Sequence, residues 1–347
     1  MNNLQAATAR GRTKIVKMLL EKGADVYAQS GAVKAAVLNG HTEVAKMLLE
    51  KHLDIKDALE AAVTNGNTEM VKMLMDIGAD SNAQSEHYRS AVQSAIENEY
   101  PKIAKMLLKK CGDVNVQREF YESVLRSAAH YGYNKLAKIL LEKGVDANAQ
   151  GGEEEESALE AAVTNRDTKM VKMLLENGAD INAHSEMYES VLVAALVQGY
   201  PEVEVLLENG ADIHARSKRY GSALLAAIAK GYPEVAEVLV EKGADVNVQS
   251  EIFGSALYAA IVKGHTNVIK MLLERGADVN VECGRYGNAL QAAAVNQNAE
   301  VVEMLLDKGA KVNTQGGLYG NALRAAMYDA HPHDLSRCYE PTRSWEL

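Results

Sequence analysis

One stretch, residues 255–281, constrains the fold most, because near copies of it fill most of the chain. It reads SALYAAIVKGHTNVIKMLLERGADVNV, which is a short apolar helix pattern, a Gly-His turn, a second helix pattern and a Gly-Ala-Asp stop. The stops, with variants, begin at Gly23, His52, Gly78, Cys111, Gly144, Gly178, Gly210, Gly243, Gly276 and Gly309. Their spacing settles to about 33 residues after Gly78. A period of this size indicates stacked supersecondary units rather than several globular domains.

Each unit carries residues that suit a helix pair. A Ser or Asn at its head can accept a hydrogen bond from a free amide of the first helical turn. These heads are Ser157, Ser222, Ser255, Asn288 and Asn321. The second helix has apolar residues at helical spacing, such as Val268, Met271 and Leu272, which predicts one buried stripe. The Gly of each stop suits a left-handed position after the helix.

The pattern S-A-L-x-A-A-x-x-x-G-H-x-x-V-x-x-L-L-x-x-G-A-D-V-N resembles the ankyrin repeat, and the resemblance covers residues 1–326. It implies an all-α, ankyrin-repeat α-solenoid of about ten helix-turn-helix repeats with short β-hairpin loops. Ten helix pairs precede the first helix of an eleventh at residues 321–326. The Tyr-Gly-Asn-Ala-Leu form at residues 286–290 and 319–323 is similar to fungal arrays, many of which follow a NACHT-type NTPase.

The chain departs from the family pattern in several places. The family's His of Thr-Pro-Leu-His is replaced by Glu160, Leu225, Tyr258, Gln291 and Arg324, so its tie between neighbouring repeats is not carried over. Short connections predict stunted or absent hairpins within residues 24–57, and a missing residue predicts an irregularity at residues 199–203. We expect one continuous repeat domain, residues 1–326, followed by a loosely ordered tail, residues 327–347.

Composition narrows the classes of function. A net charge of −10 argues against a general nucleic-acid binder. Cys111, Cys283 and Cys338 lie far apart and are interpreted as free thiols in a reducing compartment. No leader and no long apolar run are present, which argues against secretion and membrane spanning. We therefore expect a monomer in the cytoplasm, with the nucleus as the alternative location.

No catalytic or cofactor-binding pattern is present. The sequence lacks the phosphate-binding G-x-x-x-x-G-K-[ST], G-x-S-x-G and H-E-x-x-H. His331, His333 and Cys338 are of metal-ligand types but lack a fourth partner, so no metal site is expected. The sequence predicts no enzyme, no cofactor and no small-molecule substrate.

An aromatic column recurs at the repeat period, which favours a packing role: Tyr88, Tyr121, Tyr188, Tyr220, Phe253, Tyr286 and Tyr319. The residues just before it vary and are expected to be exposed hairpin tips. The candidate partner-binding residues are His87, Glu119, Phe120, Glu154, Glu155, Glu186, Met187, Lys218, Arg219, Ile252, Tyr258, Arg285 and Leu318. Their charges run from acidic to basic along the array, which would orient a partner. A solvated rim with no specific ligand is the alternative interpretation.

Two functional hypotheses follow from the resemblance. The first is a non-enzymatic scaffold that binds another protein through a concave face made of hairpin tips and first helices. The second is the recognition portion of a larger NACHT-type signalling ATPase, present here as a fragment. An enzyme is the third class, and no nucleophile, base and orienting group occur together to support it.

Overall fold

The computed structural model describes residues 3–24, 30–51, 55–79, 86–109, 118–148, 156–183 and 188–327. Within them the chain forms 21 α-helices, a π-helical turn at Met75–Ala79 and a two-stranded antiparallel ribbon. Contacts divide the chain into two compact units, Met1–Gly151 and Gly152–Leu347. The all-α, helix-pair architecture predicted from the repeats is confirmed. The boundaries of a single domain at residues 1–326 stay a prediction.

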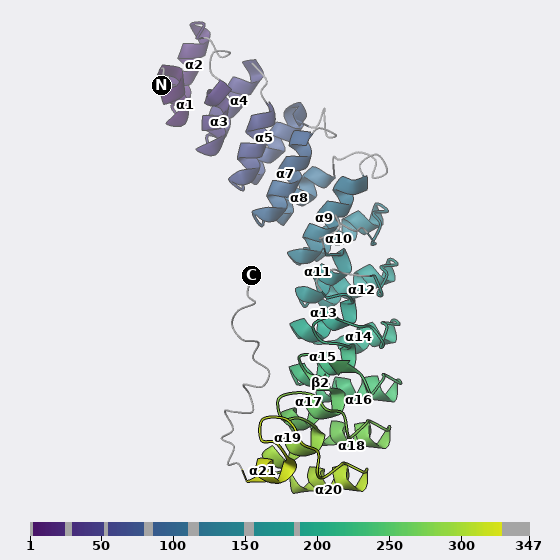
Figure 1. The fold of residues 1–347 in the computed structure, drawn as a ribbon. Coiled ribbons are helices and arrows are strands. Elements are labelled where there is room, and N and C mark those ends of the chain that lie inside the picture. Colours follow the sequence, from purple (N-terminus) through teal and green to yellow (C-terminus); the bar gives the residue numbers. More distant parts are fainter. Residues whose placement is uncertain are drawn as a thin grey trace. The chain divides into compact units, whose positions relative to one another are not determined.

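The first unit contains five helix pairs, in which the first helices stack on one another and the second helices form a second layer (Figure 1). The pairs are α1 (Asn3–Ala9) with α2 (Thr13–Glu21), α3 (Ser30–Leu38) with α4 (Thr42–Lys51), α5 (Ile55–Thr64) with α6 (Thr68–Leu74), α7 (Glu86–Glu97) with α8 (Pro101–Leu108), and α9 (Arg118–His130) with α10 (Asn134–Glu142). The connections at residues 25–29 and 52–54, where stunted hairpins were predicted, lie outside the described residues.

The second unit repeats the same two layers and ends on a lone first helix, α21 (Ala322–Ala326), as Figure 1 shows. Its pairs are α11 (Ala158–Thr164) with α12 (Thr168–Glu176), α13 (Val191–Gln198) with α14 (Val203–Glu208), α15 (Ala223–Lys230) with α16 (Pro233–Glu241), α17 (Ala256–Lys263) with α18 (Thr266–Glu274), and α19 (Ala289–Val295) with α20 (Ala299–Asp307). Helix α14 has six residues, whereas α16 and α18 have nine. The predicted loose tail is residues 327–347, of which residues 328–347 lie outside the described part.

Side-chain caps of one kind begin five of the six first helices of the second unit, as the sequence predicts. In each case the side-chain oxygen accepts a hydrogen bond from the backbone N–H three residues later, at 2.9–3.2 Å. The capping residues are Ser157, Ser222, Ser255, Asn288 and Asn321. A cap of this kind contributes about 1 kcal/mol to a helix, so five short helices gain defined starting points.

The buried stripe of α18 differs in one residue from the predicted stripe. Val268 and Leu272 are fully buried, but Met271 is only half-buried, and Ile269 and Leu273 complete the face. The reason is that α18 packs against α17 and also between α16 and α20, which requires a wider apolar face than one row. No helix in the described ranges is apolar over enough residues to cross a membrane.

The backbone conformation of the residue after the aromatic column distinguishes loops from helices there. In the second unit this residue is Glu189, Gly221, Gly254, Gly287 or Gly320, each with φ between 63° and 101°. Glycine accepts this left-handed conformation without strain, so the chain turns and the Ser or Asn that follows caps the helix. In the first unit the same places hold Arg89 and Glu122, which are helical. Helices α7 and α9 consequently have 12 and 13 residues.

Candidate functional site

Four of the predicted contact residues form a regular series in the second unit. Arg219, Ile252, Arg285 and Leu318 recur every 33 residues, and each lies in a turn just before a first helix. Ile252 is 51% and Leu318 53% exposed, and both arginines are exposed. We call these four residues the tip row. The series alternates between a cation and a branched apolar side chain.

The turns that carry the tip row are closed by backbone pairing. Strands β1 (Gln249–Ser250) and β2 (Gly254–Ser255) pair antiparallel around Ile252, with Ser250 opposite Gly254. Equivalent hydrogen bonds close the other three turns. They are Gly221 N–H to Ser217 O at 2.6 Å, Cys283 N–H to Gly287 O at 2.9 Å and Gly316 N–H to Gly320 O at 2.8 Å. The predicted short β-hairpin loops are therefore present in the second unit.

Aromatic residues directly after the tips support these turns. The rings of Tyr220 and Phe253 stack with centroids 5.5 Å apart, and those of Tyr286 and Tyr319 stack at 6.1 Å. Tyr220, Phe253 and Tyr286 are buried, which confirms the packing role predicted for this column. Leu318 N–H also donates to Arg285 O at 3.0 Å, so consecutive tips contact each other. Ring stacking and contacts between consecutive turns thus hold the residues of the tip row in place.

Lys218, beside the tip row, is anchored through its backbone while its charge stays in solvent. Its N–H donates to Glu189 Oε2 at 2.6 Å, and its Nζ lies 3.6 Å from Glu189 Oε1. The Lys218 side chain is 95% exposed, so this ion pair is worth little and leaves the ammonium accessible. The Arg219 guanidinium lies over the Tyr220 ring, with Cζ 5.8 Å from the centroid.

Tyr258 was predicted to contact a partner, and its burial contradicts this. The side chain is 3% exposed, and its hydroxyl accepts a hydrogen bond from Tyr286 N–H of the next repeat at 3.0 Å. Gln291, at the same place one repeat later, donates through Nε2 to Gly316 O at 3.1 Å. These residues occupy the family's His place and tie neighbouring loops, a role that the sequence analysis missed.

Other predicted contact residues do not join the tip row. Glu119 and Phe120 belong to helix α9 of the first unit rather than to a hairpin tip, because Glu122 is helical where the equivalent residues of the second unit are left-handed. Glu119 is exposed and Phe120 half-buried. His87 lies within helix α7, and its side chain is outside the described part. Four further candidates also lie outside the described residues: Glu154, Glu155, Glu186 and Met187.

Comparison with known families agrees with this architecture. A model described as ankyrin repeats (3 copies) matches residues 33–118, 91–185, 183–250 and 248–316, and one described as ankyrin repeats (many copies) matches residues 4–49. The chain belongs to the ankyrin repeat family, whose members are generally protein–protein interaction modules and typically non-enzymatic.

No curated protein sequence matches the chain significantly. Among solved structures, the human ASB11 ankyrin repeat domain is similar at 28% identity, with a TM-score of 0.48. That match covers 63% of this chain and 98% of the ASB11 chain.

Proposed function

We propose that this chain is a non-enzymatic scaffold that binds another protein through the tip row and the neighbouring first helices of the second unit. One observation carries the proposal. Arg219, Ile252, Arg285 and Leu318 are exposed at equivalent positions of four consecutive turns that backbone pairing holds closed. A preordered set of side chains loses less entropy on binding than a flexible one.

The chemistry of the tip row suggests the kind of partner surface that it fits. Carboxylates would pair with Arg219 and Arg285, and apolar side chains would cover Ile252 and Leu318. We therefore propose a partner segment in which acidic and apolar residues alternate. Lys218 adds a further exposed cation, which would accelerate association with an acidic segment at low ionic strength.

Affinity capture from the lysate of the native host, followed by titration of the purified partner, tests this proposal. The test variant changes Lys218, Arg219 and Arg285 to Ala. We expect it to lose the partner retained by the wild-type chain, and we expect wild-type affinity to fall with salt.

The matched control removes three exposed cations from the second-helix side of the same unit: Lys169→Ala, Lys242→Ala and Lys308→Ala. It changes the net charge equally and should keep the partner. If the tip variant binds as tightly as the control, the tip row is not the binding surface.

The finer hypotheses rest on the sequence. A role as the recognition portion of a larger NACHT-type ATPase is supported by the Tyr-Gly-Asn-Ala-Leu resemblance, and a coding sequence for such an NTPase in frame upstream would favour it. We also propose a cytoplasmic monomer without a cofactor. Imaging of the tagged chain tests the location, and light scattering tests the monomeric state. A nucleotide turnover assay tests for the use of a nucleotide cofactor.

A further inference from the structure

Asparagine side chains connect consecutive repeats of the second unit in a series that we call the Asn ladder. Each carboxamide uses both of its polar atoms. Its Oδ1 accepts from a backbone N–H of the next repeat at 2.8 Å, and its Nδ2 donates to the carbonyl of that repeat's stop glycine at 3.1–3.4 Å. The sets are Asn182 with Gly210 and Asp212, Asn247 with Gly276 and Asp278, and Asn280 with Gly309 and Lys311.

The ladder is interrupted at His214, which stands where neighbouring repeats of the second unit have Asn182, Asn247 and Asn280. The backbone is unchanged there, since His214 N–H donates to Asp212 Oδ1 at 2.8 Å, as Asn280 N–H does to Asp278 Oδ1. Only the side chain differs. Both polar atoms of Asn branch from Cγ, whereas in His only Nδ1 does, so imidazole cannot reproduce the paired contact.

The interruption leaves two backbone groups of the next repeat without their ladder partner. These groups are Asp245 N–H and Gly243 O. Among the described residues 188–327, no side chain forms the hydrogen bonds with them that an Asn carboxamide forms in the other repeats of the ladder. We call this place, defined by His214, Gly243 and Asp245, the ladder gap. It exposes one donor and one acceptor in the spacing that a carboxamide matches in three other repeats.

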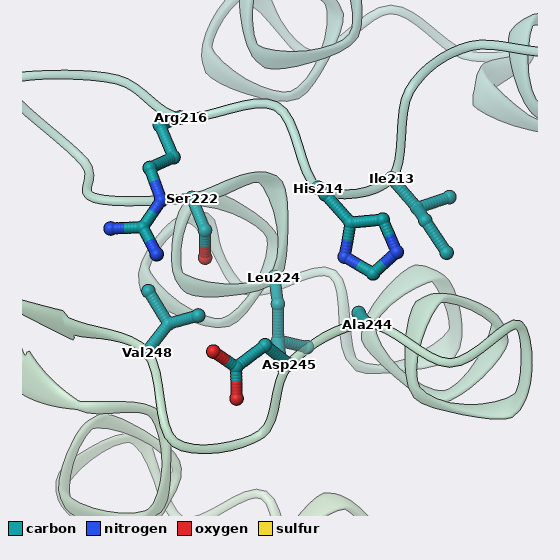
Figure 2. Close-up of a pocket in the computed structure, with 8 residues that line it drawn as sticks. All are labelled: Ile213, His214, Arg216, Ser222, Leu224, Ala244, Asp245 and Val248. Atoms are coloured by element: carbon teal, nitrogen blue, oxygen red, sulfur yellow. The ribbon is translucent and has the colours of Figure 1, made fainter.

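A cavity of about 100 Å³ borders the ladder gap on the side of His214 and Asp245 (Figure 2). It is lined by Ile213, His214, Arg216, Ser222, Leu224, Ala244, Asp245 and Val248. Leu224, Ala244 and Val248 are buried, whereas His214, Arg216 and Asp245 are exposed, so an apolar floor lies beneath a polar, accessible rim. One water molecule occupies about 30 Å³ in the liquid, so the cavity has room for a small side chain.

We propose that the ladder gap binds the side-chain carboxamide of an Asn or Gln of the partner protein, an inference that rests on the proposed scaffold function. A carboxamide both donates and accepts, so it pairs Gly243 O and Asp245 N–H together. A carboxylate only accepts, so it would leave Gly243 O unpaired. Arg216 and Asp245 both line the cavity, and their opposite charges offset each other towards an anion. An aliphatic side chain would pair neither group. The ladder gap thus selects a partner side chain that both donates and accepts a hydrogen bond, whereas the tip row selects acidic and apolar side chains of the partner.

Nuclear magnetic resonance of the full chain tests the gap with small probes. The probes are the N-acetyl dimethylamides of asparagine, aspartate and leucine, which differ only in their side chains and of which only the first contains a primary carboxamide. We expect the asparagine probe alone to shift the Asp245 amide resonance in a saturable way. An equal or larger response to the aspartate probe would make the site an anion site, and no response to any probe would mean that it binds nothing of this kind. Either result overturns the proposal.

Two reciprocal variants sharpen the test. His214→Asn supplies the missing carboxamide from within the chain, so probe affinity should fall about tenfold. Asn247→His opens an equivalent gap, and the Asp278 amide should then become responsive. An unchanged response in His214→Asn contradicts the inference. Because these readouts need no partner, they remain decisive if the capture experiment fails, and a lost tip-row interaction leaves them unaffected.

Discussion

Replacing Tyr258 by Phe removes a single oxygen atom from a contact between two repeats. Its hydroxyl accepts the hydrogen bond of Tyr286 N–H at 3.0 Å, and the two side chains are 3% and 2% exposed. The ring remains, so little packing is lost. A buried donor that loses its acceptor costs about 1–3 kcal/mol. We expect Tyr258→Phe to lower the stability of the junction between these repeats by that amount.

Hydrogen exchange of the Tyr286 amide is the direct assay, because opening of one junction in a repeat array precedes global unfolding. Protection at this amide should fall by roughly five- to hundredfold, since about 1.4 kcal/mol corresponds to a factor of ten. Urea unfolding followed by circular dichroism gives the global effect. Tyr131→Phe, at a side chain that is 39% exposed, is the control and should change stability by less than about 0.5 kcal/mol.

Unchanged protection at Tyr286 in a folded Tyr258→Phe chain would refute the reasoning. Partner binding provides a second readout. Because Tyr258 is buried, the variant should keep its partner, and a selective loss of binding would restore Tyr258 as a direct contact residue.

Four further results are expected. Gln297 has φ 54°, a left-handed conformation that only glycine adopts without strain, so Gln297→Gly should raise the free energy of unfolding by about 1 kcal/mol. Gly264 is left-handed too, and a Cβ there meets no atom within 4 Å, so Gly264→Ala should lower that free energy by a similar amount through backbone strain. Urea titrations measure both changes. Leu272→Ala, at a fully buried position, should cost about 2–5 kcal/mol, and an unchanged unfolding midpoint would contradict the core assignment. Burial lowers the pKa of His265 in the folded chain. As the pH falls, His265 of the unfolded chain is therefore protonated first, which favours unfolding. The free energy of unfolding should decline as the pH falls from about 6.5 towards the folded pKa. Thermal melts of His265→Gln should show a smaller decline.

The candidate surface could be predicted in part because its residues recur at the repeat period in the sequence. Arg219, Ile252, Arg285 and Leu318 occupy the same place in four consecutive repeats, so exposure of one implies exposure of the others. Glu119 and Phe120 were placed on a hairpin because the aromatic column was aligned without weighing the residue after it. Position 122 lacks the glycine found in four turns of the second unit, but Glu189 turns without one, so this signal was only partial.

Local structure was determined by the sequence alone. A cap such as Ser255 bonds to an amide three residues away, and the left-handed Gly276 ends its own helix, so neither needs information from another repeat. The Asn ladder joins atoms 28 to 31 residues apart, and the Tyr258 contact joins atoms 28 residues apart. Only the stacked structure decides which of these polar groups meet. For the same physical reason the ladder gap at His214 was not recognised in the sequence: a missing contact is defined by the neighbour that would have received it.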